Sequence, residues 1–331
     1  MDIKIGFFGV KSWEKESIVD QITRLPVYGV GIFEEEVQDK LDIALEYDVI
    51  STFIYSDLSK KVLDKLPKLK MVAARSTGVD HIDGVECQKR KIEVKNVPEY
   101  GSQTVAEYTV ALMMALTKKI IPAHQSVENG EFSPEGLTGI DVFGKTLGVV
   151  GVGKIGANVV KLGRGLGMKV IGVEKNADEA MAKKHGFKNV DLETCLKQAD
   201  IVTLHVPSIP QTYHLINKKN IGLMKKGSYL INTCRGPVVE SAAVVWALNK
   251  GVLAGAALDV VEEESRVENI SVVLTDDTKK ADLQDILSFH LLRDRDDVII
   301  TPHNAFNTRE AVGRIVATTV DNILEFVKNS R

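Results

Sequence analysis

Short runs of apolar residues alternate with amphipathic segments along most of this chain. The runs are IKIGFFG, DVISTFIY, KMVAARS, TLGVVG, KVIGV, IVTLHV, SYLINT, AGAALDV and VIITPH. Each is short enough to be a buried strand, and the segments between most of them have helical periodicity. Strands that alternate with helices form parallel sheets whose faces are covered by those helices. The hydrophobic pattern therefore predicts an α/β protein.

The last segment of the chain predicts a long closing helix. Its apolar residues recur along one helical face at Val312, Val316, Val320, Ile323 and Val327. Asn307 and Glu310 have the spacing of a capping box, which places the expected start of the helix beside Asn307. No strand follows this helix, so we expect it to pack on a sheet formed earlier in the chain.

Length, composition and charge exclude several classes of protein. The chain has 331 residues, of which 44% are hydrophobic and 26% charged, which is enough for two globular domains. With a net charge of -3 and no Lys/Arg-rich tract, it lacks the basic surface that attracts nucleic acid. No apolar stretch approaches the roughly 20 residues of a membrane span, and the N-terminus does not resemble a signal peptide. We expect a cytoplasmic protein with neither nucleic acid nor membrane as a partner.

The three cysteines give no sign of a disulfide framework or a metal site. Cys87, Cys195 and Cys234 are isolated in the sequence, without the Cys-x-x-Cys spacing of a zinc site. We therefore expect no metal.

Two motifs have the spacing of phosphate-binding loops, but only one has the right surroundings. GIDVFGKT at residues 139–146 matches a nucleoside-triphosphate loop, yet its lysine precedes the run TLGVVG instead of following a strand. GVGKIG at residues 151–156 follows that run directly and leads into a helical segment, as a dinucleotide-binding loop requires. We interpret the second motif as the cofactor loop.

Three glycines and one acid make up the core of the expected cofactor site. Gly151 permits the tight turn, Gly153 lets the backbone approach a pyrophosphate, and Gly156 allows close packing of helix and strand. The next run ends at Glu174, whose carboxylate can accept hydrogen bonds from the adenosine ribose and repel a 2′-phosphate. The motif thus favours NAD over NADP, although the neighbouring Lys175 is a cation that tolerates a phosphate.

Polar residues end three of the later runs. Arg235 follows SYLINTC, Asp259 and the glutamates 262–264 follow AGAAL, and His303 follows VIITP. In a doubly wound sheet these carboxyl ends face the cofactor crevice. Considered one at a time, each has an ordinary structural explanation. The arginine would form a surface salt bridge, the glutamates would be a solvated run of charges, and the histidine would be a structural residue. Taken together, they are the set that reduction of a 2-oxo acid requires.

That reduction needs three groups besides the hydride of the cofactor. A guanidinium supplies a two-pronged grip on the carboxylate of the acid. An imidazolium can donate its proton to the keto oxygen near neutral pH and take it back in the reverse direction. A neighbouring carboxylate stabilises that imidazolium.

At these motifs the sequence resembles the D-isomer-specific 2-hydroxyacid dehydrogenases, and within them the D-lactate and D-2-hydroxyisocaproate dehydrogenase branch. The resemblance covers nearly the whole chain. It rests on RSTGVDHID, VPEYGSQTVAEYT, GVVGVGKIG, DIVTLHVP, LINTCRGPVV, AALDVVEEE and VIITPHNAF. The long connection from Glu264 to His303 also resembles the lactate branch. The family implies two Rossmann-like domains, a flavodoxin-like substrate domain and an NAD-binding doubly wound parallel sheet, with the active site in the cleft between them.

Residue by residue, the resemblance implies catalytic roles for three side chains. Arg235 would anchor the substrate, His303 would be the acid/base, and Glu264 would be the partner of the histidine. The implied substrate contacts are the backbone of Thr77 and Gly78, with Tyr100 and Phe306 nearby. The cofactor-binding residues would be Gly151, Gly153, Lys154, Ile155, Gly156, Glu174, Val206, Pro207, Thr233, Cys234 and Asp259.

The pocket for the substrate side chain is less clearly marked. Phe53 and Tyr55 end a strand and offer an apolar wall for a small aliphatic or aromatic group, or they pack as ordinary strand-end residues. The sequence also departs from the family at YGS, where Tyr100 is followed by Gly-Ser and not by the usual Ser-Pro, and at Glu174, where aspartate is more usual.

The motifs also place the domain boundaries. The cofactor loop begins only at residue 151, so we expect residues 1–100 and 304–331 to form the substrate domain and residues 101–303 the NAD-binding domain. The apolar segment SQTVAEYTVALMMAL, which begins at Ser102, resembles the dimer element of the family. We therefore expect a homodimer.

The expected function is NAD-dependent reduction of a small 2-oxo acid to the D-2-hydroxy acid. Reduction of pyruvate to D-lactate is the first candidate reaction. Alternatives are a related enzyme for 2-oxoisocaproate, phenylpyruvate or hydroxypyruvate, and a phosphite dehydrogenase. A different class is an NAD-sensing protein like the transcriptional corepressors that share this fold. NADH oxidation driven by pyruvate separates the enzymes from the corepressors.

Overall fold

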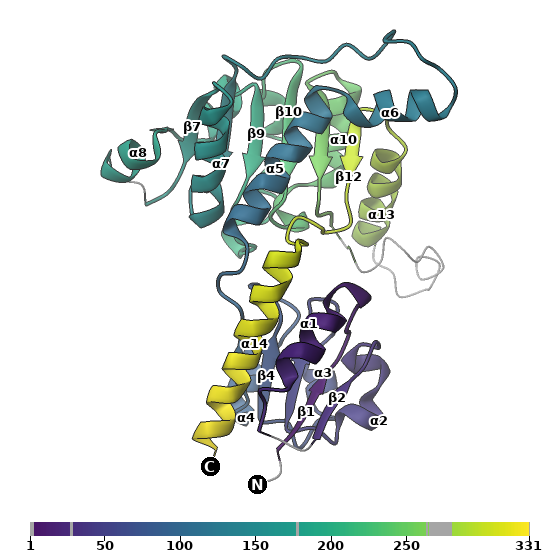
Figure 1. The fold of residues 1–331 in the computed structure, drawn as a ribbon. Helices are drawn as coiled ribbons and strands as arrows, with labels where there is room; N and C mark the ends of the chain where they lie inside the picture. The colour runs from purple at the N-terminus through teal and green to yellow at the C-terminus, as the bar shows by residue number, and fades with distance from the viewer. Residues whose placement is uncertain (1–2, 27–28, 177–178, 263, 265–279, 331) are drawn as a thin grey trace. The chain divides into compact units, whose positions relative to one another are not determined.

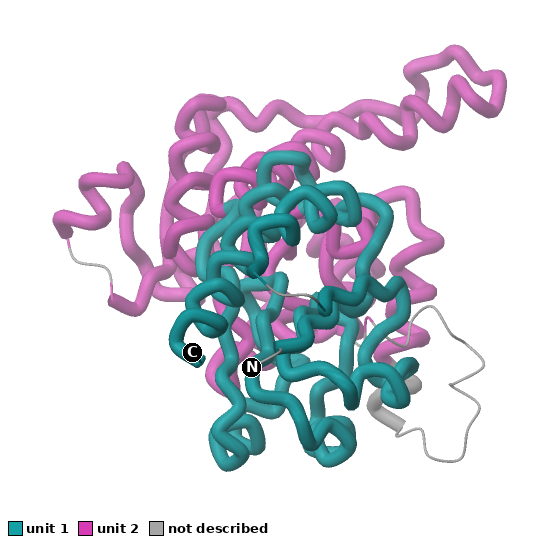
Figure 2. The backbone as a smooth tube through the Cα atoms, turned by 60° about the horizontal axis from the view of Figure 1, so that its bottom comes forward, with its two compact units in different colours: residues 1–101, 307–331 teal, residues 102–306 magenta. Residues whose placement is uncertain are grey.

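The computed structural model describes residues 3–26, 29–176, 179–262, 264 and 280–330. Glu263 and residues 265–279 of the long connection from Glu264 to His303 lie outside the described residues. The chain divides into two compact units, which Figure 2 colours separately. Unit 1 comprises residues 1–101 and 307–331, and unit 2 comprises residues 102–306.

Unit 1 is built on a five-stranded parallel sheet in the order β2-β1-β3-β4-β5. Its strands are β1 (Lys4–Phe7), β2 (Gly29–Ile32), β3 (Val49–Thr52), β4 (Met71–Ala74) and β5 (Glu93–Lys95). Successive residues of a strand face opposite sides of a sheet. In β4, Met71 and Ala73 join one buried core, while Val72 and Ala74 join the other. Both faces are therefore covered, which explains the continuous apolar runs in the sequence.

The closing helix packs on one face of this sheet. The helices of unit 1 are α1 (Ser12–Ile22), α2 (Leu41–Ala44), α3 (Lys60–Leu63), α4 (Gly84–Arg90) and α14 (Arg309–Asn329). Figure 1 shows α14 beside α1, and the two helices share a buried core with β1 and β4. The five apolar residues predicted for one face of the closing helix are all buried there.

The predicted start of this helix was wrong. Its N-cap is Thr308, whose hydroxyl accepts a hydrogen bond from the backbone N–H of Ala311 at 3.2 Å. The cap therefore lies one residue later than Asn307, and Glu310 stands at the second helical position, where it cannot close a capping box. Asparagine and threonine are both good caps, so the local sequence did not distinguish the two positions.

Unit 2 is built on a seven-stranded parallel sheet in the order β12-β11-β10-β9-β6-β7-β8. Its strands are β6 (Thr146–Val150), β7 (Lys169–Val173), β8 (Lys188–Asn189), β9 (Ile201–Leu204), β10 (Ser228–Asn232), β11 (Leu253–Leu258) and β12 (Val298–Ile300). From β6 the chain first adds strands on one side and then, from β9, on the other. This reversal beside β6 is the switch point at which open α/β sheets bind their ligands.

Helices cover both faces of the second sheet (Figure 1). They are α5 (Ser102–Thr117), α6 (Ile120–Glu128), α7 (Lys154–Gly165), α8 (Glu179–His185), α9 (Leu192–Gln198), α10 (Ser241–Asn249) and α13 (Lys280–Arg293). Residues of α5 and α7 share one buried core with the sheet, and residues of α9 and α10 share the other. The sheet is doubly wound, as the sequence predicted.

The described residues contain neither a membrane-spanning helix nor a cluster of metal ligands. Within these ranges no helix combines the length and apolar character needed to cross a bilayer. In the same ranges no three His, Cys, Asp or Glu side chains gather into a possible metal site. The cytoplasmic location expected from the sequence stays a prediction.

Candidate active site

The glycine loop joins β6 to α7 at the switch point of the second sheet. Gly151 has a φ of +90°, and a Cβ there would lie 2.4 Å from the carbonyl oxygen of His205. A Cβ on Gly156 would lie 2.0 Å from the carbonyl oxygen of Gly151, so this residue must also be glycine. Gly153 differs, because a Cβ built on it meets nothing within 4 Å. Open space at Gly153, at the N-terminus of a 12-residue helix, fits the pyrophosphate of a dinucleotide.

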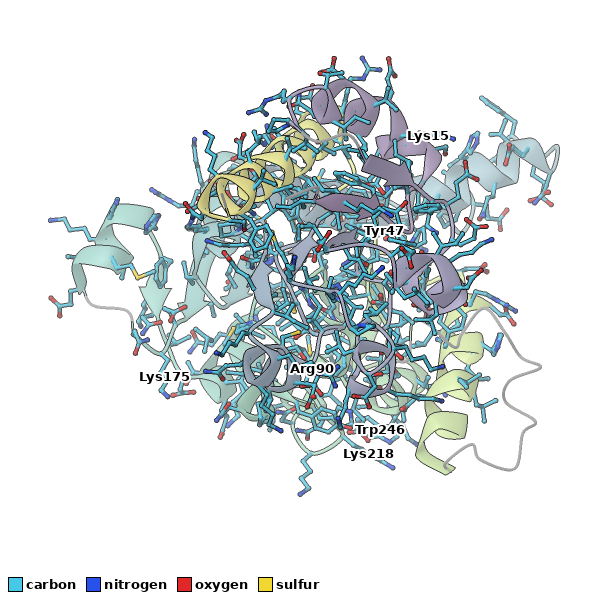
Figure 3. All side chains as sticks on the ribbon, turned by 90° about the horizontal axis from the view of Figure 1, so that it is seen from below. Lys15, Tyr47, Arg90, Lys175, Lys218 and Trp246 are labelled. Atoms are coloured by element: carbon cyan, nitrogen blue, oxygen red, sulfur yellow. The ribbon has the colours of Figure 1, made fainter. Side chains whose placement is uncertain are left out.

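Glu174 lies beside this loop at the end of β7. Its carboxylate accepts hydrogen bonds from the backbone N–H groups of Val152 at 3.0 Å and Asn176 at 3.3 Å. The negative charge is therefore held next to the glycine loop, where a 2′-phosphate on the adenosine ribose would be repelled. The neighbouring Lys175 is exposed, at the periphery of the view in Figure 3. This arrangement fits NAD.

The motif GIDVFGKT has no such surroundings. Its Lys145 lies directly before β6, and its last residue, Thr146, is the first of that strand. A triphosphate loop must leave a strand and open a helix, and this segment does the reverse.

Two residues predicted for catalysis, Arg235 and His303, and one predicted for cofactor binding, Asp259, follow three neighbouring strands. Arg235 follows β10, Asp259 follows β11, and His303 follows β12. These strands are adjacent in the sheet and all parallel, so their carboxyl ends lie along one edge. Tertiary structure thus gathers side chains that are far apart in the sequence.

His303 and Glu264 form a hydrogen-bonded pair. The imidazole Nδ1 lies 2.9 Å from Oε2 of the carboxylate, and 21% and 31% of the two side-chain surfaces remain exposed. An ionised carboxylate only accepts hydrogen bonds, so Nδ1 carries the proton and Nε2 is left for other chemistry. The second oxygen of Glu264 accepts from the backbone N–H of Val261 at 3.3 Å, which fixes the orientation of the carboxylate.

Asp259 shapes the turn that presents His303. Its carboxylate accepts hydrogen bonds from the hydroxyl of Thr301 at 2.5 Å and from the backbone N–H groups of Asn304 and Ala305 at 2.8 and 2.9 Å. Its carbonyl oxygen accepts from the N–H of His303, which has a left-handed φ of +51°. Burial raises the pKa of this carboxyl, and the three hydrogen bonds act against that rise. The structure therefore places both carboxylate oxygens on the turn, and the predicted contact with the cofactor stays a prediction.

Arg235 begins a short 3-10 turn at residues 236–238. Its Nη1 donates to the carbonyl oxygen of Cys234 at 2.7 Å, and its own carbonyl oxygen accepts from the side chain of Asn232 at 3.0 Å. The side chain is half-buried. The guanidinium fork is thus held at the edge of the sheet that carries His303.

The other predicted cofactor residues lie around the same sheet edge. Val206 and Pro207 follow β9, and Val206 lies against the glycine loop. The hydroxyl of Thr233 lies 2.8 Å from that of Thr109 on α5. Cys234 is buried, its thiol donates to the side chain of Asn232, and burial raises the pKa of that thiol. Lys154 is exposed and Ile155 half-buried on the first turn of α7.

Most of the predicted substrate residues belong to unit 1. The hydroxyl of Thr77 donates to the carbonyl oxygen of Val97 at 2.8 Å, and the carbonyl oxygen of Gly78 accepts from Ser76 at 2.6 Å. The carbonyl oxygen of Tyr100 accepts a hydrogen bond from Arg314. These bonds order the loop after β4 and the last residues before α5. Phe306 belongs to unit 2, where it is buried.

Phe53 is part of an aromatic cluster at the end of β3. Its ring lies 5.7 Å from that of Trp13 and 5.8 Å from that of Tyr55, both edge to face. Phe53 is only 4% exposed, whereas Tyr55 is 44% exposed. Phe53 packs within this cluster and Tyr55 presents an aromatic surface, and the predicted contact of Phe53 with the substrate stays a prediction.

Two polar pairs with buried carboxylates were missed by sequence reasoning. In unit 1, Arg75 and Glu14 are fully buried, and the guanidinium donates to both carboxylate oxygens at 2.9 and 3.0 Å. In unit 2, His214 Nε2 lies 2.5 Å from the carboxylate of Glu262, which is 5% exposed. The position of Arg75 at a strand end was the only signal for the first pair. For the second there was none, because His214 lies in a polar segment between strands.

Comparisons with known proteins point to one family. Residues 110–305 match the family model of the NAD binding domain of D-isomer specific 2-hydroxyacid dehydrogenases. The D-3-phosphoglycerate dehydrogenase of Methanocaldococcus jannaschii is 34% identical over 311 residues, which are 93% of this chain but only 55% of that protein. An aromatic 2-oxoacid reductase of Clostridium sporogenes is 37% identical over 290 residues, covering 86% of this chain and 84% of the relative.

Solved structures give the same result. The D-lactate dehydrogenase of Aquifex aeolicus, in a complex with NAD and lactic acid, aligns with a TM-score of 0.86 and 33% identity. The alignment covers 98% of this chain and 96% of that one.

Proposed function

This chain belongs to the family of D-isomer-specific 2-hydroxyacid dehydrogenases, which use NAD, and from that premise we propose that it reduces pyruvate to D-lactate. The observation that carries the proposal is the hydrogen bond between His303 and Glu264, at the same sheet edge as Arg235. A histidine with a carboxylate on Nδ1 and its Nε2 available is arranged as an acid/base.

In the proposed reaction each side chain has one task. Arg235 binds the carboxylate of the 2-oxo acid, because a guanidinium can donate two parallel hydrogen bonds to it. His303 donates the proton on Nε2 to the keto oxygen, and in the reverse direction Nε2 takes the proton from the hydroxyl group. Glu264 holds the imidazole through Nδ1–H and stabilises its positive charge before the proton leaves. Bound NADH supplies the hydride.

Two observations bear on the preferred substrate. The likeness to a D-lactate dehydrogenase supports pyruvate. The likeness to an aromatic 2-oxoacid reductase and the aromatic cluster of Trp13, Phe53 and Tyr55 support phenylpyruvate as a second candidate. In either case we propose that the backbone of Thr77 and Gly78 contributes to substrate binding.

A panel of 2-oxo acids tests the proposal. We expect NADH oxidation with pyruvate, and a lower kcat/KM with phenylpyruvate, 2-oxoisocaproate and hydroxypyruvate. A higher kcat/KM with phenylpyruvate would replace the first candidate by the second. Reduction of NAD by phosphite would identify the phosphite dehydrogenase reaction. NADH binding without oxidation by any acid would favour the corepressor-like alternative.

We also propose that the protein is a homodimer. The predicted dimer element, α5, buries much of its apolar surface within unit 2. Five of the exposed large apolar side chains lie on α6 and the segment after it, at Ile120, Ile121, Val127, Phe132 and Phe143. Phe132 is 93% exposed, which is unfavourable for a large apolar side chain unless another chain covers it. Light scattering after gel filtration should give a dimer mass, and a monomer mass at micromolar concentration would refute the proposal.

A further inference from the structure

The turn that carries Arg235 is in contact with the turn that carries Glu264. A Cβ on Gly236 would lie 1.9 Å from the carbonyl oxygen of Val261 and 2.8 Å from the backbone nitrogen of Glu262. Only glycine allows the two backbones to come this close. A displacement of either turn would therefore displace the other.

A third segment joins these two turns through His214. The backbone N–H of His214 donates to the carbonyl oxygen of Pro237, within the 3-10 turn that follows Arg235, at 2.8 Å. Two residues later, Ile216 N donates to Val238 O at 3.1 Å. The segment around His214 is thereby fixed to the turn that carries Arg235.

The side chain of His214 reaches the other turn. Its Nε2 lies 2.5 Å from Oε1 of Glu262, and the ring stacks on Tyr213 with centroids 4.0 Å apart. The other oxygen of Glu262 accepts a hydrogen bond from the backbone N–H of Ser241, the first residue of α10, at 2.7 Å. A carboxylate at a helix N-terminus is favoured by the partial positive charge there. Glu262 is thus held by donors on two different segments.

The charged neighbours of this pair come from the same segments. The backbone N–H of Lys218 donates to the carboxylate of Glu240, the residue before α10, at 2.8 Å. Arg235 directly precedes the 3-10 turn at residues 236–238, and Glu264 is two residues after Glu262 in the sequence. The pair of His214 and Glu262 therefore lies among the segments that hold the proposed catalytic groups.

We propose that His214 and Glu262 are positioning residues that hold Glu264 against His303. The inference rests on the proposed function and adds a second imidazole and carboxylate pair to its site. Glu262 directly follows Val261, whose backbone N–H donates to Glu264, and the two hydrogen bonds of Glu262 fix the backbone at that point. Without the donor on His214, the buried carboxylate of Glu262 loses one hydrogen bond, and the backbone beside it shifts to provide another donor. That shift breaks the hydrogen bond between Glu264 and Nδ1 of His303.

Two variants that carry the same amide group test this role. In His214→Gln the side-chain nitrogen reaches about as far as Nε2 and can still donate to Glu262. In His214→Asn it is one methylene too short. Residue 214 has a φ of +47°, a conformation that asparagine tolerates well, so the shorter variant has no added backbone strain. Urea unfolding of both variants checks that they fold.

We expect His214→Asn to lower kcat about 10-fold, a part of the roughly 10²-fold that a displacement of 1 Å can cause. The pH midpoint of 2-oxo acid reduction should move to lower pH, as it does when Glu264 itself is replaced. NADH affinity should change less than about twofold, since the glycine loop is untouched. His214→Gln should restore kcat and the pH midpoint. If His214→Asn does not fold, His214→Leu takes its place, because leucine fills the space of the ring without a donor. The same changes in kcat and pH midpoint are then expected.

A double variant shows whether His214 acts through Glu264. Interacting residues have non-additive effects, so His214→Asn should cause no further pH shift in a Glu264→Gln background. Equal shifts in both backgrounds, or a parental pH profile in His214→Asn, would overturn the inference and leave the proposed function intact. An unmodified protein that reduces none of the 2-oxo acids would instead refute the proposed function. The NMR signal of the His303 ring, followed across pH in the unmodified protein and in His214→Asn, tests the positioning without turnover, and identical titrations would overturn it.

Discussion

Replacement of Glu264 by glutamine removes one negative charge beside His303 and keeps the length of the side chain. The amide oxygen of glutamine can still accept the hydrogen bond from Nδ1, which now spans 2.9 Å to the carboxylate. The geometry of the pair is thereby retained, and the variant isolates the electrostatic part of the interaction.

The expected effect is about one pH unit. Two opposite charges 2.9 Å apart interact by about 1.4 kcal/mol in bulk water and by about 6 kcal/mol at the effective dielectric constant near a protein surface. Because only 21% and 31% of the two side chains are exposed, the pair lies between these limits, and the lower figure is the smallest effect expected. Hydrogen bonds to charged groups exceed neutral ones by about 1 kcal/mol, which agrees. Since 1.36 kcal/mol corresponds to one pH unit, the pH profile of the reaction should move by about one unit.

The direction follows from the role of the imidazolium as proton donor. Reduction requires the protonated ring, so the pH midpoint at which kcat/KM for pyruvate declines should fall by about one unit in Glu264→Gln. The midpoint at which D-lactate oxidation rises should fall with it, because that direction requires the neutral ring. Glu193→Gln is the matched control, since it removes an exposed carboxylate that pairs only with Lys197 among the described contacts of its side chain. An unchanged profile, or a shift to higher pH, would refute the role given to Glu264.

Four further predictions concern single side chains. His303→Gln should depress turnover about 10²- to 10⁴-fold, the range of general acid catalysis, while fluorescence titration shows NADH affinity nearly unchanged. Arg235→Lys should raise KM for pyruvate about 10-fold or more with a smaller effect on kcat, since a point charge replaces a two-pronged grip; an unchanged KM would place the carboxylate elsewhere. The unmodified protein should prefer NADH to NADPH in kcat/KM, and Glu174→Ala should narrow that ratio; equal use of both cofactors by the unmodified protein would remove the argument. Iodoacetamide should leave activity intact at pH 7, because burial raises the pKa of the Cys234 thiol and keeps it protonated; rapid inactivation prevented by Cys234→Ser would contradict this.

The strands show which part of the fold can be predicted from the sequence. All nine apolar runs correspond to strands, because these strands are covered on both faces or nearly so. Three further strands, β2, β5 and β8, were not predicted. Each lies at an edge of its sheet, and its residues are only partly buried or exposed. An edge strand needs less apolar sequence, so hydrophobic pattern alone does not mark it.

The candidate active site also has a part that the sequence predicts and a part that it does not. The ends of parallel strands meet at one edge, so the grouping of Arg235, Asp259 and His303 follows from the order of elements. The partners supplied by turns do not follow from it. Glu262 and Glu264 are separated by one residue and read as one charge run, yet the first pairs with His214 and the second with His303. That distinction depends on the path of each turn in three dimensions.

Chiral analysis of the product tests the central claim most directly. The protein would be incubated with pyruvate and NADH, and the lactate formed would be separated into its enantiomers and compared in amount with the NADH consumed. The account predicts one D-lactate for each NADH oxidised, and none above background with His303→Gln. Formation of L-lactate, or no lactate from any preparation that binds NADH, would contradict it.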